Sequence, residues 1–180
     1  LVTEHIRAKK PGQTALHFHH TYDRKTYVAD GDNFWRMTNY IPSVTYNTVR
    51  DPQILRNAGM AFGEFQNDLA DFEIGRLMET IPNFHNTPDR FRQFKEAVEQ
   101  DAAGRRAAVQ ADIDFMMERE ELACTLQRMR ENGELPLRVT HNDTKLNNVL
   151  LDKKTRNALC VLDLDTVMPG LSLYDFGDSI

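Results

Sequence analysis

The most informative part of the sequence is HNDTKLNN at residues 141–148, which is followed by LDLD at residues 162–165. The first segment carries Asp143 and, five residues later, Asn148. The second places Asp163 directly after the apolar run 159–162. A short apolar run between turn residues is typical of a buried strand. We therefore expect Asp163 to stand at the end of a strand, near the loop that carries Asn148.

These residue types suit the transfer of a phosphoryl group to a hydroxyl. That reaction needs a group that orients the hydroxyl and accepts its proton, and cations that neutralise the phosphate oxygens. Asp143 can accept the proton, and the oxygens of Asn148 and Asp163 are ligands of the kind that Mg²⁺ prefers. An Asp-x-x-x-x-Asn pattern alone is common in polar loops. The prediction therefore rests on its combination with Lys145 and with Asp163 after a strand.

The pattern His141-x-Asp143-x-x-x-x-Asn148 resembles the catalytic loop H-x-D-x-x-x-x-N of protein kinases and aminoglycoside phosphotransferases. Within that superfamily, residues 141–152 and 161–178 look most like N-acetylhexosamine 1-kinases. Those enzymes phosphorylate the anomeric hydroxyl of N-acetylated hexosamines. The resemblance implies an enzyme that uses ATP and Mg²⁺ to phosphorylate a small-molecule hydroxyl, with a sugar as substrate.

The same resemblance implies a role for individual residues. Asp143 would be the catalytic base, Lys145 would neutralise the transferred phosphate, and His141 would brace the loop. Asn148 and Asp163 would bind Mg²⁺, with Asp165 as a further metal or substrate ligand. The segment 36–41 would be the hinge that meets the adenine of ATP, and its residues expected to bind the nucleotide are Met37, Thr38, Asn39 and Tyr40.

Residues 175–177 spell Asp-Phe-Gly, the sequence that carries the metal-binding aspartate of protein kinases. Asp175 lies 32 residues after Asp143 and follows no apolar strand, whereas Asp163 lies 20 residues after Asp143 and does follow one. We therefore expect Asp163 to be the metal ligand. Asp175 resembles a later aspartate of the family, which supports the catalytic loop through hydrogen bonds.

Local patterns predict an α+β, protein-kinase-like fold. Alternating residues over 13–40 indicate strands, with a hairpin turn at 30–32. From Asp51 the apolar period becomes helical, with Pro52 at the first helical position and a stripe that continues to Phe72. Further helices are predicted from Thr87 and over 109–130. Apolar runs at 137–139, 149–151 and 159–162 predict short strands, the last two joined by a turn at 152–157.

We expect two lobes with ATP in the cleft between them. Residues 1–41 would be the remnant of an N-terminal β lobe with the hinge, and residues 42–180 a mainly helical lobe with the catalytic loop. The glycine-rich loop, the strand lysine and its glutamate partner are expected before Leu1, and helices of the sugar site after Ile180. A chain of this extent is expected to hold the catalytic loop without the whole active site.

Composition narrows the other possibilities. The net charge is −5 and no basic block occurs, which argues against nucleic acid as a partner. No apolar stretch is long enough for a membrane span. The two cysteines, Cys124 and Cys160, sit in apolar surroundings and fit reduced core residues of a cytoplasmic protein. His17, His19 and His20 have no cysteine or acidic cluster beside them, so surface or packed histidines are favoured over a metal site.

Several readings of the function stay open at this stage. Choline, homoserine or an aminoglycoside are alternative acceptors, because one catalytic loop serves all of them. A kinase-like module that binds nucleotide without turnover is a second class of function. Hydrolysis of sulfate esters has little support, since the sequence contains no Cys-x-Pro-x-Arg or Ser-x-Pro-x-Arg motif.

Overall fold

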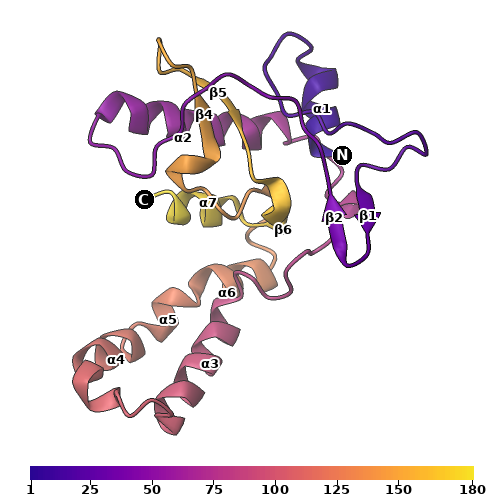
Figure 1. The fold of residues 1–180 in the computed structure, drawn as a ribbon. Coiled ribbons are helices and arrows are strands. Elements are labelled where there is room, and N and C mark those ends of the chain that lie inside the picture. The colour runs from indigo at the N-terminus through magenta and orange to yellow at the C-terminus, as the bar shows by residue number, and fades with distance from the viewer. The chain divides into compact units, whose positions relative to one another are not determined.

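The computed structural model describes all residues from 1 to 180, and they form two compact units (Figure 1). The first unit comprises residues 1–80 and 138–180, and the second comprises residues 81–137. The first contains the main hydrophobic core and every candidate site residue named above. The predicted lobe boundary after Ile41 falls inside this unit and stays a prediction about the family fold.

The first unit begins with a helix that the sequence patterns did not predict. Helix α1 (Val2–Lys9) buries Val2, Thr3 and Ile6 and exposes its charged side chains. Its apolar face consists of little more than Val2 and Ile6, one turn apart, so it carries too weak a period to stand out among polar neighbours.

Helix α2 (Pro52–Asp68) begins and packs as predicted. The carboxylate of Asp51 accepts a hydrogen bond of 2.9 Å from the backbone N–H of Gln53, and Pro52 occupies the first turn. The predicted stripe is buried at Ile54, Ala58, Ala61, Phe62, Phe65, Leu69 and Phe72. Leu55 is the exception, since half of its surface is exposed.

The N-terminal β region is smaller than predicted. Strands β1 (Val28–Asp30) and β2 (Asn33–Trp35) form the expected antiparallel hairpin, and Gly31 adopts the positive φ of 58° that its turn requires. The rest of residues 13–40 forms no regular strand. A single antiparallel bridge joins Phe18 to Thr38.

Two further strand pairs flank the segment 141–148. Strands β4 (Val149–Leu151) and β5 (Ala158–Val161) form the predicted hairpin, and Asp152 organises its turn by accepting hydrogen bonds from Lys154 and Thr155. Strand β3 (Arg138–Thr140), which was predicted, pairs with β6 (Met168–Gly170). Strand β6 was not predicted. The pair lies so close that a Cβ on Gly170 would stand 2.3 Å from the hydroxyl of Thr140. Only glycine fits this approach.

Three 3₁₀ turns and a last helix complete the first unit. They are η1 (Ile74–Arg76), η3 (Leu146–Asn148), η4 (Leu164–Thr166) and α7 (Ser172–Asp178). The core combines buried side chains of α1, α2, β3, β4 and β5. His141 and its neighbour Thr140 are fully buried beside this core.

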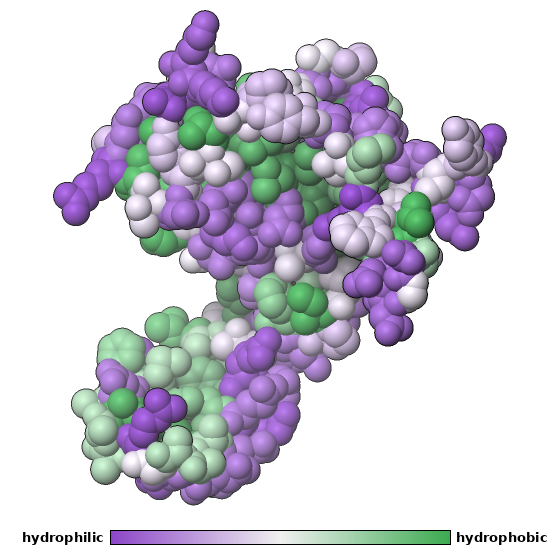
Figure 2. Space-filling model, in the orientation of Figure 1, coloured by the Kyte–Doolittle hydropathy of each residue, from purple (hydrophilic) through white to green (hydrophobic).

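The second unit is helical. It contains α3 (Thr87–Gln100), capped by the side chain of Asn86, then η2 (Arg106–Val109), α4 (Gln110–Met117), α5 (Glu120–Ala123) and α6 (Thr125–Glu131). The single helix predicted over 109–130 was wrong. Its apolar positions Met117 and Leu122 are five residues apart, which breaks the stripe, and Leu122 is 73% exposed. Figure 2 shows apolar side chains at the surface of this unit.

The structure contains no helix that has both the length and the apolar composition required to cross a membrane.

Candidate active site

The β4–β5 hairpin brings Asn148 and Asp163 to the same end of two paired strands. Val149 pairs with Val161, and the backbone N–H of Leu162 donates to the carbonyl of Asn148 at 2.9 Å. Asn148, which ends η3, therefore lies across the hairpin from Leu162, and Asp163 follows as the next residue. Asn148 is buried, whereas the Asp163 side chain is 45% exposed. The register of one hairpin thus places two oxygen-bearing side chains together.

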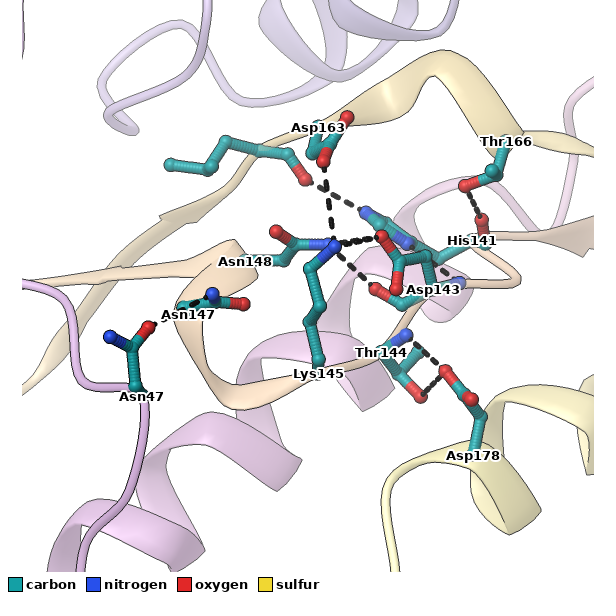
Figure 3. Close-up of polar contacts among 11 residues, drawn as sticks. Asn47, His141, Asp143, Thr144, Lys145, Asn147, Asn148, Asp163, Thr166 and Asp178 are labelled. Atoms are coloured by element: carbon teal, nitrogen blue, oxygen red, sulfur yellow. Dashed lines mark hydrogen bonds and ion pairs between the residues drawn. The ribbon is translucent and has the colours of Figure 1, made fainter.

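Asp143 lies beside them and receives two side-chain hydrogen bonds (Figure 3). Lys145 Nζ lies 2.6 Å from Asp143 Oδ2, and Asn148 Nδ2 donates to the same oxygen at 2.9 Å. The Lys145 ammonium also lies 3.8 Å from Asp163 Oδ2. The structure therefore brings together Asp143, Lys145, Asn148 and Asp163, four of the residues singled out in the sequence.

The charges in this cluster set the ionisation of its members. Burial by itself would raise the pKa of Asp143, but the hydrogen bonds from Lys145 and Asn148 outweigh it and lower the pKa below its ordinary value. The hydrogen bond to Asp143 raises the pKa of Lys145. At neutral pH the pair is a carboxylate and an ammonium, which are the states required of a proton acceptor and of a group that neutralises phosphate.

His141 holds the predicted catalytic loop against the end of β5. Its Nε2 donates to the carbonyl of Leu162 at 2.9 Å, and its Nδ1 accepts a longer hydrogen bond from the N–H of Asp143. Since a carbonyl can only accept, the Nε2 nitrogen carries the proton. The ring packs edge-on against Phe62 and Phe65 of α2. One buried imidazole thus joins the loop, the hairpin and α2.

Asp175 supports the loop from α7, as predicted. Its buried carboxylate accepts hydrogen bonds from the backbone N–H groups of His141, at 2.9 Å, and Asn142, at 2.7 Å. Gln66 of α2 donates to it as well. The aspartate of the Asp-Phe-Gly sequence therefore supports the loop. It makes no hydrogen bond to Asn148 or Asp163.

Backbone strain accompanies this arrangement. Asn142 and Asp163 adopt positive φ values of 64° and 60°, which are uncommon for residues other than glycine. Asn142 is held by two hydrogen bonds from its own amide group, to the carbonyls of Thr140 and Thr166. Residues in such conformations persist where the surroundings determine them, which is common at functional sites.

Asp165 does not join the cluster. Both of its carboxylate oxygens bind the guanidinium of Arg36, at 2.6 and 2.7 Å. Its predicted role as a metal or substrate ligand therefore has no support from these contacts, and it stays a prediction.

The predicted nucleotide residues border an open groove of about 510 Å³. Thr38, Asn39 and Tyr40 line one side, and Leu150 and Asp163 are among the residues that line the rest. Met37 is exposed and does not line the groove, although its carbonyl accepts a hydrogen bond from His19. The groove therefore joins most of the predicted hinge to one of the predicted metal ligands.

The residues present fit a magnesium ion better than a softer metal. No group of three or more His, Cys, Asp or Glu side chains is arranged to hold a metal. Asn148 and Asp163 offer hard oxygen ligands, and Asn148 turns its amide nitrogen toward Asp143, which leaves its oxygen directed away (Figure 3). Mg²⁺ is commonly held by one or two such side chains together with substrate phosphates and water.

Comparison with protein-family models shows the family of this chain. The model of the phosphotransferase enzyme family matches residues 11–180, which includes every site residue described above. The chain belongs to the phosphotransferase enzyme family. This family implies a protein-kinase-like fold, small-molecule substrates, the use of ATP and usually a divalent metal. The mixture of helices and small sheets in the structure is consistent with the predicted α+β class.

Three supporting contacts in this phosphotransferase were not predicted from the sequence. Asp178 accepts hydrogen bonds from the backbone N–H and the hydroxyl of Thr144, the residue after Asp143. Thr166 donates its hydroxyl to the carbonyl of His141, and Arg36 binds Asp165. Only Asp178 could have been identified from the sequence, because it lies one helical turn after Asp175 and so on the same face of the helix.

Proposed function

We propose that this phosphotransferase transfers the terminal phosphoryl group of ATP, with Mg²⁺, to a hydroxyl group of a small molecule. The observation that supports this best is the cluster of Asp143, Lys145, Asn148 and Asp163 beside a groove bordered by Thr38, Asn39 and Tyr40. Its catalytic loop resembles that of N-acetylhexosamine 1-kinases. The leading acceptor is therefore the anomeric hydroxyl of an N-acetylhexosamine.

Asp143 is proposed to act as the catalytic base. Its carboxylate accepts the hydroxyl proton while the hydroxyl oxygen bonds to the terminal phosphorus and the bond from that phosphorus to ADP breaks. Its hydrogen bonds from Asn148 and Lys145 orient it and keep it ionised. His141 and Asp175 hold the backbone of the loop, which keeps the base in position.

Lys145 is proposed to neutralise the transferred phosphate. Its flexible stem is 51% exposed and its ammonium already lies between two carboxylates, within reach of a group bound beside Asp143. Asn148 and Asp163 would hold Mg²⁺, which when bound neutralises phosphate oxygens and aligns the transfer. Leu150 would contact the adenine with apolar surface, and residues 38–40 would contact it with backbone groups.

Other small molecules are alternative acceptors of the phosphoryl group. Choline, homoserine and aminoglycosides are phosphorylated with the same type of catalytic loop, and substrate choice depends on residues outside it. A module that binds ATP without transfer is the remaining alternative, and it predicts nucleotide binding with no phosphorylated product.

The test uses the purified intact gene product with ATP, Mg²⁺ and a panel of N-acetylhexosamines, other sugars, choline, homoserine and aminoglycosides. Phosphorus NMR identifies the product. We expect a sugar 1-phosphate from an N-acetylhexosamine, and a loss of about 10²–10⁴-fold in kcat for Asp143→Asn, because the isosteric amide cannot accept the proton. Asp112→Asn, an exposed position in α4, is the matched control and should keep full activity.

Each alternative gives a distinct result. A phosphorylated product from another acceptor would replace the sugar and leave the rest of the proposal intact. ATP binding without any product would favour the non-catalytic module. Full activity of Asp143→Asn would remove Asp143 from the role of base.

A further inference from the structure

One contact joins two distant parts of the sequence at the edge of the groove. Arg36 and Asp165 are 129 residues apart, and they form a two-pronged ion pair with Nη1–Oδ1 at 2.6 Å and Nη2–Oδ2 at 2.7 Å. Arg36 follows β2 and precedes the predicted nucleotide segment 37–40. Asp165 lies in η4, two residues after Asp163. The guanidinium also lies 5.5 Å from the centre of the Phe18 ring.

The turn that carries Asp165 is held from several sides. On the catalytic-loop side, Thr166 donates its hydroxyl to the carbonyl of His141. Thr80 donates its hydroxyl to the carbonyl of Asp165 itself. Arg36 supplies the contact from the side of the nucleotide segment. Because Asp163 holds an unfavourable positive φ, the orientation of its side chain depends on how firmly the residues after it are anchored.

The pair also stands between two hollows of the first unit. Phe18, Arg36 and Leu164 line the groove with Asp163, and they also line a second hollow of about 670 Å³. Asp165 lines the second hollow and not the groove. Its carboxylate is thus directed toward Arg36 rather than into the space that Asp163 borders.

We propose that Arg36 is a positioning residue, whose ion pair with Asp165 fixes the turn that presents Asp163, and that Asp165 serves this pair instead of binding the metal. The proposal rests on the function proposed above. A planar guanidinium that binds both oxygens of a carboxylate sets an orientation as well as a distance, which a lysine cannot do. Both side chains are about half exposed, so the pair adds little to stability. Its effect is therefore expected in metal binding and catalysis rather than in unfolding.

The test is a double-mutant cycle with Arg36→Gln, Asp165→Asn and the double variant. The measurements are the dissociation constant of Mn²⁺ in the presence of a non-hydrolysable ATP analogue, by electron paramagnetic resonance, together with kcat and the melting temperature. We expect each single variant to weaken Mn²⁺ binding by about tenfold, as contacts behind a metal ligand commonly do. The double variant should lose no more than either single one. Arg36→Lys should recover only part of the loss.

The ion pair between Lys25 and Asp23, whose two side chains are each 60% exposed, supplies the control. Lys25→Gln should change neither Mn²⁺ affinity nor kcat. If Asp165→Asn weakens Mn²⁺ binding and Arg36→Gln does not, Asp165 is a metal ligand and the proposal fails. Losses that multiply in the double variant would overturn it too. A wild-type protein that neither binds Mn²⁺ with the analogue nor transfers phosphate would defeat the proposed function itself, which separates the two failures.

Discussion

Asp175 holds the backbone of the predicted catalytic loop with both of its carboxylate oxygens. One of its oxygens accepts from the N–H of His141 and from Gln66, and the other accepts from the N–H of Asn142. The two backbone donors belong to buried residues, His141 and Asn142, so water cannot readily replace the carboxylate there. A buried donor without an acceptor costs the full free energy of its desolvation. Both oxygens of the carboxylate are therefore needed as acceptors.

We therefore predict that Asp175→Asn destabilises the protein by about 1–3 kcal/mol and lowers kcat, because one oxygen becomes an amide nitrogen that faces a donor. Urea denaturation and steady-state kinetics measure the two effects. Asp112→Asn, at an exposed position in α4, is the control and should cost clearly less. Equal losses for the two variants would contradict this account.

A second prediction at this scale concerns pH. Burial raises the pKa of Cys160 to about 11. An unfolded cysteine has a pKa of about 8.5, so between these values the unfolded chain loses the proton that the folded chain keeps. Proton loss from the unfolded state favours unfolding, and stability should therefore fall as the pH rises from about 8.5 toward 11.

The variant Cys160→Ala removes this contribution. The free energy of unfolding, measured by urea denaturation at pH 8 and pH 10, should fall less in the variant than in the wild-type protein. The difference between the two proteins cancels the titration of lysines and tyrosines common to both. An identical pH dependence would show that the thiol stays accessible to water.

At the scale of the element, helix α2 shows why some segments follow from local sequence. Its cap, its proline and its apolar stripe all lie within the helix or next to it. The helix also supplies Phe62 and Phe65, which pack against His141, so its stability bears on the catalytic loop.

Asp51→Ala is predicted to destabilise the protein by about 1 kcal/mol, because the N–H of Gln53 loses its side-chain acceptor. Thermal or urea unfolding measures the change. Asp51→Ser should retain most of the stability, since serine also caps helices. If alanine and serine are equivalent here, the cap contributes nothing.

The two units differ most at the scale of the whole molecule. The first contains the cluster of side chains that are least exposed, such as Leu69, Val149, Leu151 and Leu171. In the second, the buried side chains are Phe91, Ile113 and Gln127. Fewer buried apolar contacts mean a smaller free energy of local opening.

Hydrogen exchange followed by mass spectrometry should therefore show slower exchange in α2, β4 and β5 than in α3 to α6. Peptides from residues 81–137 should exchange through openings that leave the first unit protected. Uniform protection across both units would mean that they open together as one cooperative body.

Local sequence determined the features whose physical cause is local. The hairpins at 28–35 and 149–161 follow from turn residues between short β-rich or apolar runs, and α2 follows from its cap and its period. The catalytic-loop residues were found because their spacing is itself short. Asp163 was predicted to be the metal ligand instead of Asp175 because an apolar strand precedes it. The structure places Asp163, and not Asp175, beside Asn148.

Tertiary structure alone decided the rest. Strand β6 forms because it pairs with β3, which lies about thirty residues earlier in the sequence. In this pair Thr140 lies opposite Met168. The pairing of Arg36 with Asp165 joins residues 129 positions apart, and no local pattern distinguishes that aspartate from a metal ligand. A carboxylate has the same sequence signature in either role. Its partner is chosen by the folded chain, because only folding brings a guanidinium or a metal within reach of it.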